Sequence, residues 1–378
     1  MDPTSVRPDP PSKKKASAMS DRKKASPQVW KSHHENDGLT KYGGRDLLGY
    51  GEKTPIPKWP GYGKVALNFV INYEEGGERC LLHGDKESEK LLSEIVGAAA
   101  LEDKRHYNME SLYDYGSRAG FWRLHRLFLR KKIPATVFAV GMALERNPAI
   151  CHALKEAPGW EIASHGYRWI DYQDVDEETE REHIKRTVEI HKRLIGKRPT
   201  GFYQGKPNVN TRKYVMEEGG FKYDSDSYAD DLPYWTFEGG FPHLIIPYTL
   251  SENDMKFVSP GGFSSGDDFC TYLKNNLRYL VEEGRAGHPK MMTVGLHCRL
   301  ARPGRVAAIS EFMDFAKSYG REVWICTREE IADFWSIHHA PIGGGRAVQP
   351  ALSVDDSSVQ HEETETKDPG DVFMEVKF

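Results

Sequence analysis

Short apolar runs alternate with longer amphipathic stretches through most of the chain. The short runs are bounded by Gly, Pro or charged residues and are typical of buried strands, which we expect at 65–72, 135–140, 161–164, 201–203, 223–225, 244–246, 291–297 and 322–326. The stretches between them repeat apolar residues with a helical period, and we expect helices at 111–132, 143–156, 176–195, 211–218, 266–283, 305–318 and 328–338. Gly196 and Gly219 directly follow two of these helices and are typical helix stop signals.

The order of these elements predicts an α/β fold. Strands that alternate with helices form parallel sheets in which the helices are the crossover connections. Seven or eight such units favour a closed or nearly closed barrel, with an open doubly wound sheet as the alternative. In such a barrel the chemistry is carried by side chains that follow the carboxyl ends of the strands, so polar residues just beyond each strand are the first candidates for a site.

Two flanking segments differ from this pattern. Residues 1–40 are polar and rich in Pro, Ser and Lys, and residues 342–378 are polar with an acidic character. Chains of low hydrophobicity cannot bury enough apolar surface to fold, so we expect two disordered tails around a single folded domain at 41–341.

Composition narrows the class of protein further. The chain of 378 residues has a formal net charge of −4, which argues against nucleic acid or an anionic membrane as the partner. No apolar run reaches the length of a membrane helix or a secretory signal, so we expect a cytoplasmic protein. The five cysteines are widely spaced without a CxxC pair and indicate free thiols in a reducing compartment: Cys80, Cys151, Cys270, Cys298 and Cys326.

Candidate chemistry lies where three predicted strands end. The strand 65–72 ends in Asn72 and is followed by Glu74, and a carboxylate there can be a general base, a metal ligand or a substrate anchor. His165 follows the strand 161–164, and His297 ends the strand 291–297. Histidine titrates near neutrality, and two histidines at two strand ends favour acid–base catalysis over a purely structural role.

Neighbouring residues suggest how a ligand would be held. Arg168 can bind a carboxylate or imide oxygen through both of its terminal nitrogens, and Arg299 is expected on the same face as His297 because it lies two residues further along. Two loops, 202–208 and 224–235, are rich in aromatic and polar groups, which bind small planar polar ligands well. Packing on the rim of the barrel is the alternative role for these aromatic residues.

Several long segments, in order, carry a family resemblance. They are NFVINYEEGGE (68–78), EIASHGYRW (161–169), PNVNTRKYVMEEGGFKYDSDSYADDLPYW (207–235), PHLIIPYTLSENDMKF (242–257) and VGLHCRLARPGR (294–305). Together they resemble the polysaccharide deacetylase (NodB-homology) superfamily, and within it most closely the metal-independent allantoinase branch. The resemblance spans about 42–339 and implies the distorted (β/α)7–8 barrel of that superfamily.

The sequence departs from the metal-dependent members of that superfamily. Those enzymes place an Asp pair in their first motif and H-[ST]-x-x-H in their second, and hold zinc or a similar cation with one Asp and two His. Here Asn72 and Glu74 stand at the Asp pair, and Trp169 stands where the second histidine would be. One carboxylate and one histidine fall short of the three protein ligands of a catalytic zinc, so we expect no catalytic metal, with zinc as the alternative if the protein is a deacetylase.

The resemblance implies a hydrolase of carbon–nitrogen bonds that opens allantoin to allantoate in purine catabolism. His165 and His297 are then the candidate base and acid in an order that the sequence leaves open, and Glu74 would orient or help deprotonate the water. The expected substrate-binding residues are Asn72, Arg168, Trp169, Tyr203, Gln204, Tyr228 and Arg299. Of these, Asn72, Arg168 and Arg299 would donate hydrogen bonds to carbonyl oxygens. The partner would be a small cyclic amide or ureide, and the branch implies a homo-oligomer. The alternatives are a chitin-like deacetylase, another cyclic amidase, or a non-catalytic barrel that only binds a ligand.

Overall fold

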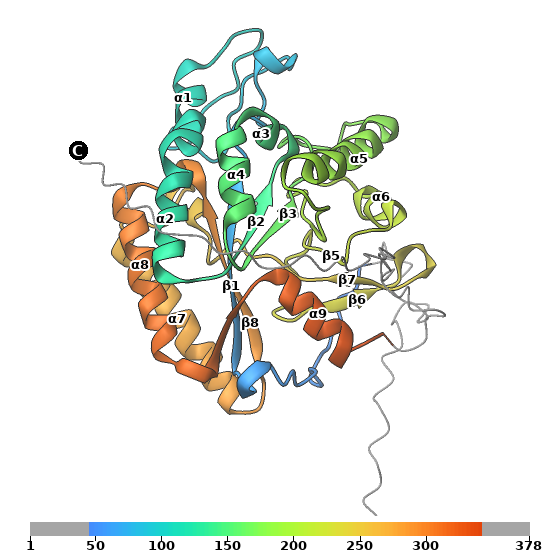
Figure 1. Cartoon of the computed structure of the whole chain (residues 1–378), viewed down its shortest axis with the longest axis vertical. Coiled ribbons are helices and arrows are strands. Elements are labelled where there is room, and N and C mark those ends of the chain that lie inside the picture. Colours follow the sequence, from blue (N-terminus) through green and yellow to red (C-terminus); the bar gives the residue numbers. More distant parts are fainter. Residues whose placement is uncertain (1–44, 342–378) are drawn as a thin grey trace, which may run out of the picture. The chain divides into compact units, whose positions relative to one another are not determined.

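The computed structural model describes residues 45–341, which form a curled sheet surrounded by helices (Figure 1). Both predicted tails, 1–40 and 342–378, lie outside the described residues. The strands are β1 (Val65–Tyr73), β2 (Ala135–Ala139), β3 (Trp160–Ser164), β4 (Gly201–Phe202), β5 (Tyr223–Asp224), β6 (Tyr234–Thr236), β7 (His243–Ile245), β8 (Lys290–His297) and β9 (Val323–Cys326). The helices are α1 (Tyr107–Tyr115), α2 (Phe121–Lys131), α3 (Gly141–Arg146), α4 (Pro148–Glu156), α5 (Glu177–Leu194), α6 (Thr211–Glu218), α7 (Gly266–Arg285), α8 (Pro303–Ser318) and α9 (Arg328–His338).

The sheet is parallel except at one edge and confirms the predicted fold class. Its strands follow the order β6-β7-β5-β4-β3-β2-β1-β8, with β9 paired to β1 and β6 antiparallel to β7. Among the described residues no strand ladder joins β6 to β8, so the sheet is a curled half-barrel. The segment 247–258 lies along β8 at this opening, where the amide of Gly295 donates to the carbonyl of Glu252 at 2.9 Å.

The predicted elements agree closely with the observed ones. All eight predicted strands are confirmed with ends that differ by one residue at most, whereas β6 was not predicted. The predicted helix 143–156 is divided into α3 and α4, because Pro148 cannot continue a helix and instead begins α4 with Asn147 as its cap. The predicted helix 111–132 begins earlier, at Tyr107, and contains a π-helical segment, Gly116–Gly120, between α1 and α2.

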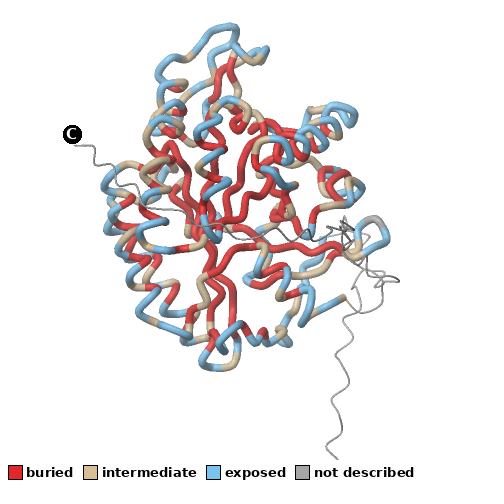
Figure 2. Tube along the Cα trace, viewed as in Figure 1, coloured by how far each residue is buried: buried red, intermediate tan, exposed pale blue. Residues whose placement is uncertain are grey.

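Alternation along the central strands separates two kinds of side chain. The odd-numbered residues of β1, from Val65 to Tyr73, belong to the large apolar core that also includes Phe128 of α2 and Phe312 of α8. The even-numbered residues point to the other side of the sheet, where Asn68 and Asn72 are buried. Figure 2 shows the central strands buried along their length. The interior of the sheet therefore receives the polar side chains of β1 together with apolar ones such as Val70, whereas the other side of β1 is apolar throughout.

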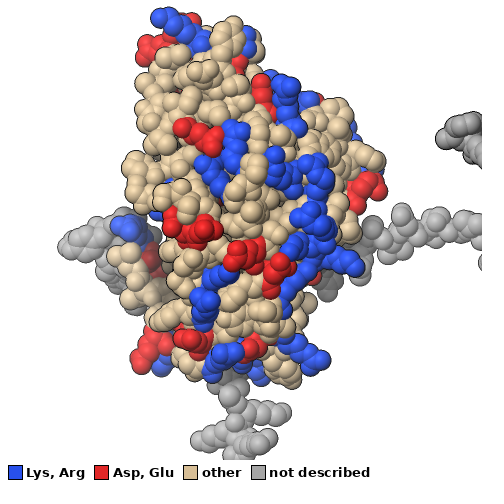
Figure 3. All heavy atoms as spheres, turned by 90° about the vertical axis from the view of Figure 1, so that its left-hand side faces the viewer, with Lys and Arg blue, Asp and Glu red and all other residues tan. Residues whose placement is uncertain are grey.

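The outer surface carries charges of both signs. On the face shown in Figure 3, Lys and Arg are interspersed with Asp and Glu. Among the helices of residues 45–341, none combines the length and the apolar character needed to cross a membrane.

Candidate active site

Glu74 lies at the centre of a buried cluster at the carboxyl ends of β1, β3 and β8. Its Oε1 lies 3.1 Å from Nε2 of His165 and 3.6 Å from Nε2 of His297, and its Oε2 accepts a hydrogen bond of 2.6 Å from Nη1 of Arg299. Asp254 contacts His297 and completes the group. We call these five residues, together with Asn72 beside His297, the mouth cluster; each is less than 5% exposed.

Strand register explains why these residues meet. In the parallel pairing of β1 with β8, Asn72 lies beside His297, and in the pairing of β1 with β2 it lies beside Phe138. Glu74 follows Asn72 by two residues, so both face the interior of the sheet. The three residues that sequence reasoning put forward for catalysis, Glu74, His165 and His297, are thus brought together. Arg299 joins them as expected, but from the 3-10 helix Cys298–Leu300 that follows β8 and not by strand alternation.

The two ring nitrogens of His165 both face acceptors. Nδ1 lies 3.0 Å from the carbonyl oxygen of Tyr203, and Nε2 lies 3.1 Å from the carboxylate of Glu74. A carbonyl and a carboxylate can only accept, so both bonds are made together only when the ring carries both protons. His165 is therefore arranged as a proton donor.

His297 is held differently. Both oxygens of Asp254 bind it, one at 2.7 Å from Nδ1 and the other at 2.9 Å from the backbone amide. This fixes the hydrogen on Nδ1 and leaves Nε2, which is beyond hydrogen-bond distance of Glu74, free to accept a proton. Sequence reasoning missed Asp254, which lies 43 residues before His297 in a segment without helical or strand periodicity.

Burial and neighbouring charges set the pKa values of Glu74 and Glu75, the two carboxyl groups that follow β1. Burial alone would raise the pKa of Glu74, but Arg299, then His297 and His165, hold that pKa well below its ordinary value. Burial raises the pKa of Glu75 to about 7, with Arg299 opposing the shift and Glu74 adding to it. Glu74 is therefore a permanent negative charge and a weak base, while Glu75 titrates near neutral pH.

Arg299 is buried with one nitrogen unpaired. Its Nε donates to the carbonyl of Leu92 at 2.6 Å, its Nη1 binds Glu74, and its Nη2 has no partner among the described residues. Leu92 has a φ of 47°, a left-handed conformation that costs a non-glycine residue roughly 1–2 kcal/mol. A strained turn therefore holds the carbonyl that positions this guanidinium, and an unpaired buried donor remains for a ligand.

Asn72 corrects one expectation. Both hydrogens of its side-chain amide are already used, at 2.9 Å to the hydroxyl of Tyr248 and 3.1 Å to the carbonyl of Leu296. The unpaired atom is instead its buried Oδ1, so Asn72 offers an acceptor and not the donor that we expected. Tyr248, which sequence reasoning did not single out, accepts from Asn72 and Asn253, and no described group accepts the hydrogen of its hydroxyl.

Two glycines allow the segment between α1 and α2 to pack closely against residues next to the mouth cluster. A Cβ on Gly116 would lie 2.3 Å from Oε1 of Glu75, and a Cβ on Gly120 would lie 1.8 Å from the carbonyl oxygen of Cys298. Both glycines belong to the π-helical segment between α1 and α2, a kind of irregularity that is frequent near functional sites. Only residues without a side chain fit here.

The other predicted binding residues are divided between the cluster and its surroundings. Trp169 lies beside Arg299, whose Cζ is 5.0 Å from the ring centroid. Tyr203 packs against His165 with ring centroids 5.0 Å apart and shares a hydrogen bond of 2.8 Å with Tyr228. Arg168 instead binds Asp85 at 2.6 Å and the carbonyls of Gly77 and Glu78, with the buried Gln204 near its own carbonyl. Arg168 therefore holds the loop after β1 and does not contact Glu74.

The donor set does not suit a divalent metal. Within residues 45–341 no three His, Cys, Asp or Glu side chains are grouped as metal ligands. The guanidinium of Arg299 neutralises the carboxylate that would bind a cation, and Trp169 stands where a second histidine would be needed.

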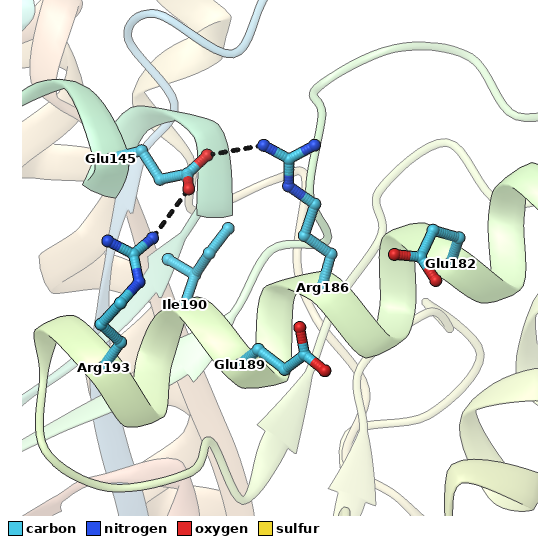
Figure 4. A pocket seen from close by; sticks show the side chains of 6 residues that line it. All are labelled: Glu145, Glu182, Arg186, Glu189, Ile190 and Arg193. Atoms are coloured by element: carbon cyan, nitrogen blue, oxygen red, sulfur yellow. Dashed lines mark hydrogen bonds and ion pairs between the residues drawn. The ribbon is translucent and has the colours of Figure 1, made fainter.

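A surface hollow elsewhere shares no residue with this cluster. It lies between α3 and α5, where Glu145 bridges Arg186 and Arg193 (Figure 4). Its charged groups are mostly paired with each other at the surface.

Comparisons with known proteins agree with the geometry. The polysaccharide deacetylase family model matches residues 104–223. A protein of Schizosaccharomyces pombe named "Putative polysaccharide deacetylase" is 43% identical over 318 residues, which cover 79% of this chain and 98% of that protein. A crystal structure of a "probable Polysaccharide deacetylase" from Pseudomonas aeruginosa PAO1 is 55% identical, with a TM-score of 0.75, and covers 78% of this chain and 99% of the other. A crystal structure of PuuE allantoinase is 54% identical, with a TM-score of 0.76, and covers 78% of this chain and 98% of the other.

Proposed function

This chain belongs to the polysaccharide deacetylase family, and we propose that within this family of hydrolases it opens the ring of allantoin to give allantoate. The observation that carries the proposal is the pair of unpaired buried atoms at the mouth cluster, the donor Nη2 of Arg299 and the acceptor Oδ1 of Asn72. A ring amide presents an N–H and a carbonyl on the same edge and supplies one partner for each. The similarity to an allantoinase over almost its whole length supports the same substrate class.

In this proposal His297 is the general base. Water attacks the acyl carbon of a ring amide, and Nε2 of His297 takes one of its protons while Asp254 keeps the hydrogen on Nδ1. The new carbon–oxygen bond places negative charge on the former carbonyl oxygen. Nη2 of Arg299 and the hydroxyl of Tyr248 are the unpaired donors that would stabilise this oxyanion.

His165 is the general acid of the same reaction. The carbon–nitrogen bond breaks as the intermediate collapses, and the proton on Nε2 of His165 passes to the departing nitrogen. Glu74 stays ionised throughout and stabilises each imidazolium in turn, because its Oε1 lies within 3.6 Å of both rings. The products are a ureide nitrogen that bears the added hydrogen and an acid that ionises at neutral pH.

Hydrolysis assays on the purified full chain test this function. Allantoin and an N-acetylglucosamine oligomer are assayed in parallel, before and after exhaustive treatment with a chelator. We expect allantoate to form at the same rate after chelation, with no release of acetate. Acetate release that chelation abolishes, without allantoin hydrolysis, would show that the protein is a metal-dependent deacetylase.

A further inference from the structure

Lys206 places a second cation beside the mouth cluster, and the mechanism above does not use it. It lies in the turn after β4, and its Nζ lies 3.4 Å from the centroid of the Trp169 ring. The Cζ of Arg299 lies 5.0 Å from the centroid of the same indole. The ring of Trp169 thus links an ammonium group to the guanidinium that binds Glu74.

The turn that carries Lys206 is firmly held. The carboxylate of Asp226 accepts the backbone amides of Gln204 and Gly205 at 2.8 and 2.7 Å, and Gly205 has a φ of 78° that favours glycine. The carbonyl of Lys206 accepts from the amide of Tyr172 at 3.1 Å. The backbone from which Lys206 extends is therefore fixed, and the Trp169 ring is the contact made by its ammonium group.

The ammonium group lacks a counter-ion. Among the described residues no carboxylate forms an ion pair with Nζ and no acceptor is hydrogen-bonded to it, although Lys206 is partly buried against Trp169. Burial lowers the pKa of Lys206, while the more distant charges of Glu89 and Glu74 oppose that shift. Arg299, by contrast, is neutralised by Glu74 at 2.6 Å. Of the two cations beside Trp169, Arg299 therefore has a carboxylate partner and Lys206 has none among the described residues.

We propose that the ammonium of Lys206, held on the face of Trp169, binds the carboxylate that ring opening creates. This inference rests on the proposed function, since hydrolysis of a neutral cyclic amide leaves a ureido acid in the site. Glu74 would repel that anion, because it is itself a buried negative charge and like charges repel. An unpaired cation offsets this repulsion, and Lys206 is the residue that supplies it.

Binding of an anionic and a neutral ligand by charge variants tests the role of Lys206. The probes are hydantoate (N-carbamoylglycine), which carries the carboxylate, and hydantoin, its neutral ring form, and both dissociation constants are measured by calorimetry. We expect Lys206→Met to weaken hydantoate binding about 10- to 100-fold, the usual value of a charge-assisted hydrogen bond, and to change hydantoin binding less than about threefold. Lys206→Arg should restore hydantoate binding, and Lys213→Met, on the exposed face of α6, should leave both constants unchanged.

Three contrary outcomes are distinguishable. If the wild-type protein hydrolyses allantoin and Lys206→Met binds hydantoate as tightly as wild type, the role of Lys206 is wrong and the proposed function stands. If the wild-type protein neither hydrolyses allantoin nor binds either probe, the proposed function itself is wrong and the inference falls with it. A loss of both hydantoin and hydantoate binding in a folded Lys206→Met protein would also contradict the inference, because it would show a general structural role.

Discussion

Two groups of buried polar side chains lie in the interior of the same sheet and differ in how completely they are paired. The mouth cluster surrounds Glu74. Deeper in the sheet, Arg328 contacts Asn68, Ser225 and Thr293, and Glu161 lies close by; we call these residues the inner cluster. Both groups contain an arginine and a glutamate that are almost fully buried.

The inner cluster is saturated. Every N–H of Arg328 has an acceptor: Nε and Nη2 bind the hydroxyl of Ser225, Nη1 binds Asn68 and Thr293, and Nη2 also reaches the carbonyls of Ile246 and Pro247. Glu161 accepts from Thr136 at 2.7 Å, from Tyr223 at 2.6 Å and from the amide of Glu329 at 2.8 Å. No atom of either charged group is left for a ligand.

The mouth cluster keeps unpaired atoms at a comparable depth. Nη2 of Arg299 and Oδ1 of Asn72 have no described partner. An aromatic layer of Phe138, Tyr203 and Tyr248 adjoins both clusters, with Phe138 5.8 Å from Cζ of Arg328 and its ring centroid 6.0 Å from that of His165. Burial of charge therefore does not by itself mark a site in this fold. Incomplete pairing is what distinguishes the mouth cluster from the inner one, although unpaired buried atoms also occur elsewhere in the described part of the chain, as at both ring nitrogens of His191. An unpaired buried polar group is costly unless a ligand completes it.

The largest expected difference between the two clusters follows from removing one ring nitrogen from the mouth cluster. His297→Asn keeps a donor near the place of Nδ1 for Asp254 and loses Nε2. We expect kcat for allantoin to fall by about two to four orders of magnitude, as for other general acid–base groups, while the free energy of unfolding changes by less than about 1 kcal/mol. Steady-state kinetics and urea denaturation measure the two effects. Wild-type kcat in this variant would remove His297 from the mechanism.

Removing the guanidinium of the inner cluster should instead lower stability. Arg328→Met leaves Asn68 and the carbonyls of Ile246 and Pro247 without their donor, so we expect the free energy of unfolding to fall by about 3–5 kcal/mol. Urea denaturation followed by circular dichroism gives this value, with Arg328→Lys as a control that keeps the charge but fewer hydrogen bonds and should be intermediate. A variant as stable as wild type would show that saturation is not what distinguishes the inner cluster.

The sequence predicted the strands of the sheet better than it predicted which side chains contact one another within it. Strand ends were recognisable because β-branched and apolar runs stop at polar residues, as at Asn72 and His297. Arg299 was expected beside His297 from strand alternation, but it contacts Glu74 from the 3-10 helix Cys298–Leu300 that follows β8. Recognising strand ends depends only on local spacing, which is why the fold class and most of the mouth cluster could be predicted.

Residues supplied by the irregular segments could not be predicted in the same way. Asp254, Tyr248 and Lys206 reach the site from loops whose course depends on tertiary contacts such as the bond between Glu252 and Gly295. Arg168 shows the opposite case. It follows a strand end, as a binding residue would, but its guanidinium is already paired with Asp85 at 2.6 Å. Spacing identifies what lies near a strand end but not which groups a loop already neutralises.

Asp254 tests whether the mouth cluster depends on the tautomer of His297. In Asp254→Asn the amide oxygen can still accept the backbone N–H of His297, while the amide hydrogen faces Nδ1 and drives the ring hydrogen to Nε2. A base with its proton already in place cannot act, so we expect kcat to fall roughly 10- to 100-fold with little change in KM. Initial-rate kinetics over a range of allantoin concentrations separate the two constants. A rise in KM at constant kcat would show instead that Asp254 shapes the binding of substrate.

The last prediction concerns how the carboxyl of Glu75, beside the mouth cluster, makes the free energy of unfolding depend on pH. Burial raises the pKa of Glu75 to about 7 from an ordinary value of 4.5, so the folded protein retains this proton over a range in which the unfolded chain has lost it. Stability should therefore fall as pH rises through that range, by up to roughly 3 kcal/mol, and level off above it. Glu75→Gln has no proton to lose, so its free energy of unfolding should rise relative to wild type between about pH 4.5 and pH 7.

The difference between the two proteins isolates this residue, because burial also raises the pKa of Glu78 and of Asp226 to about 7, and both titrate in each protein. Urea denaturation of wild type and Glu75→Gln at a series of pH values gives the difference directly, and the most acidic points serve as the reference. A difference that is constant with pH would mean that Glu75 is already ionised in the folded protein. In that case the carboxylates of Glu74 and Glu75 would share the charge of Arg299, and the mouth cluster would be as fully neutralised as the inner one.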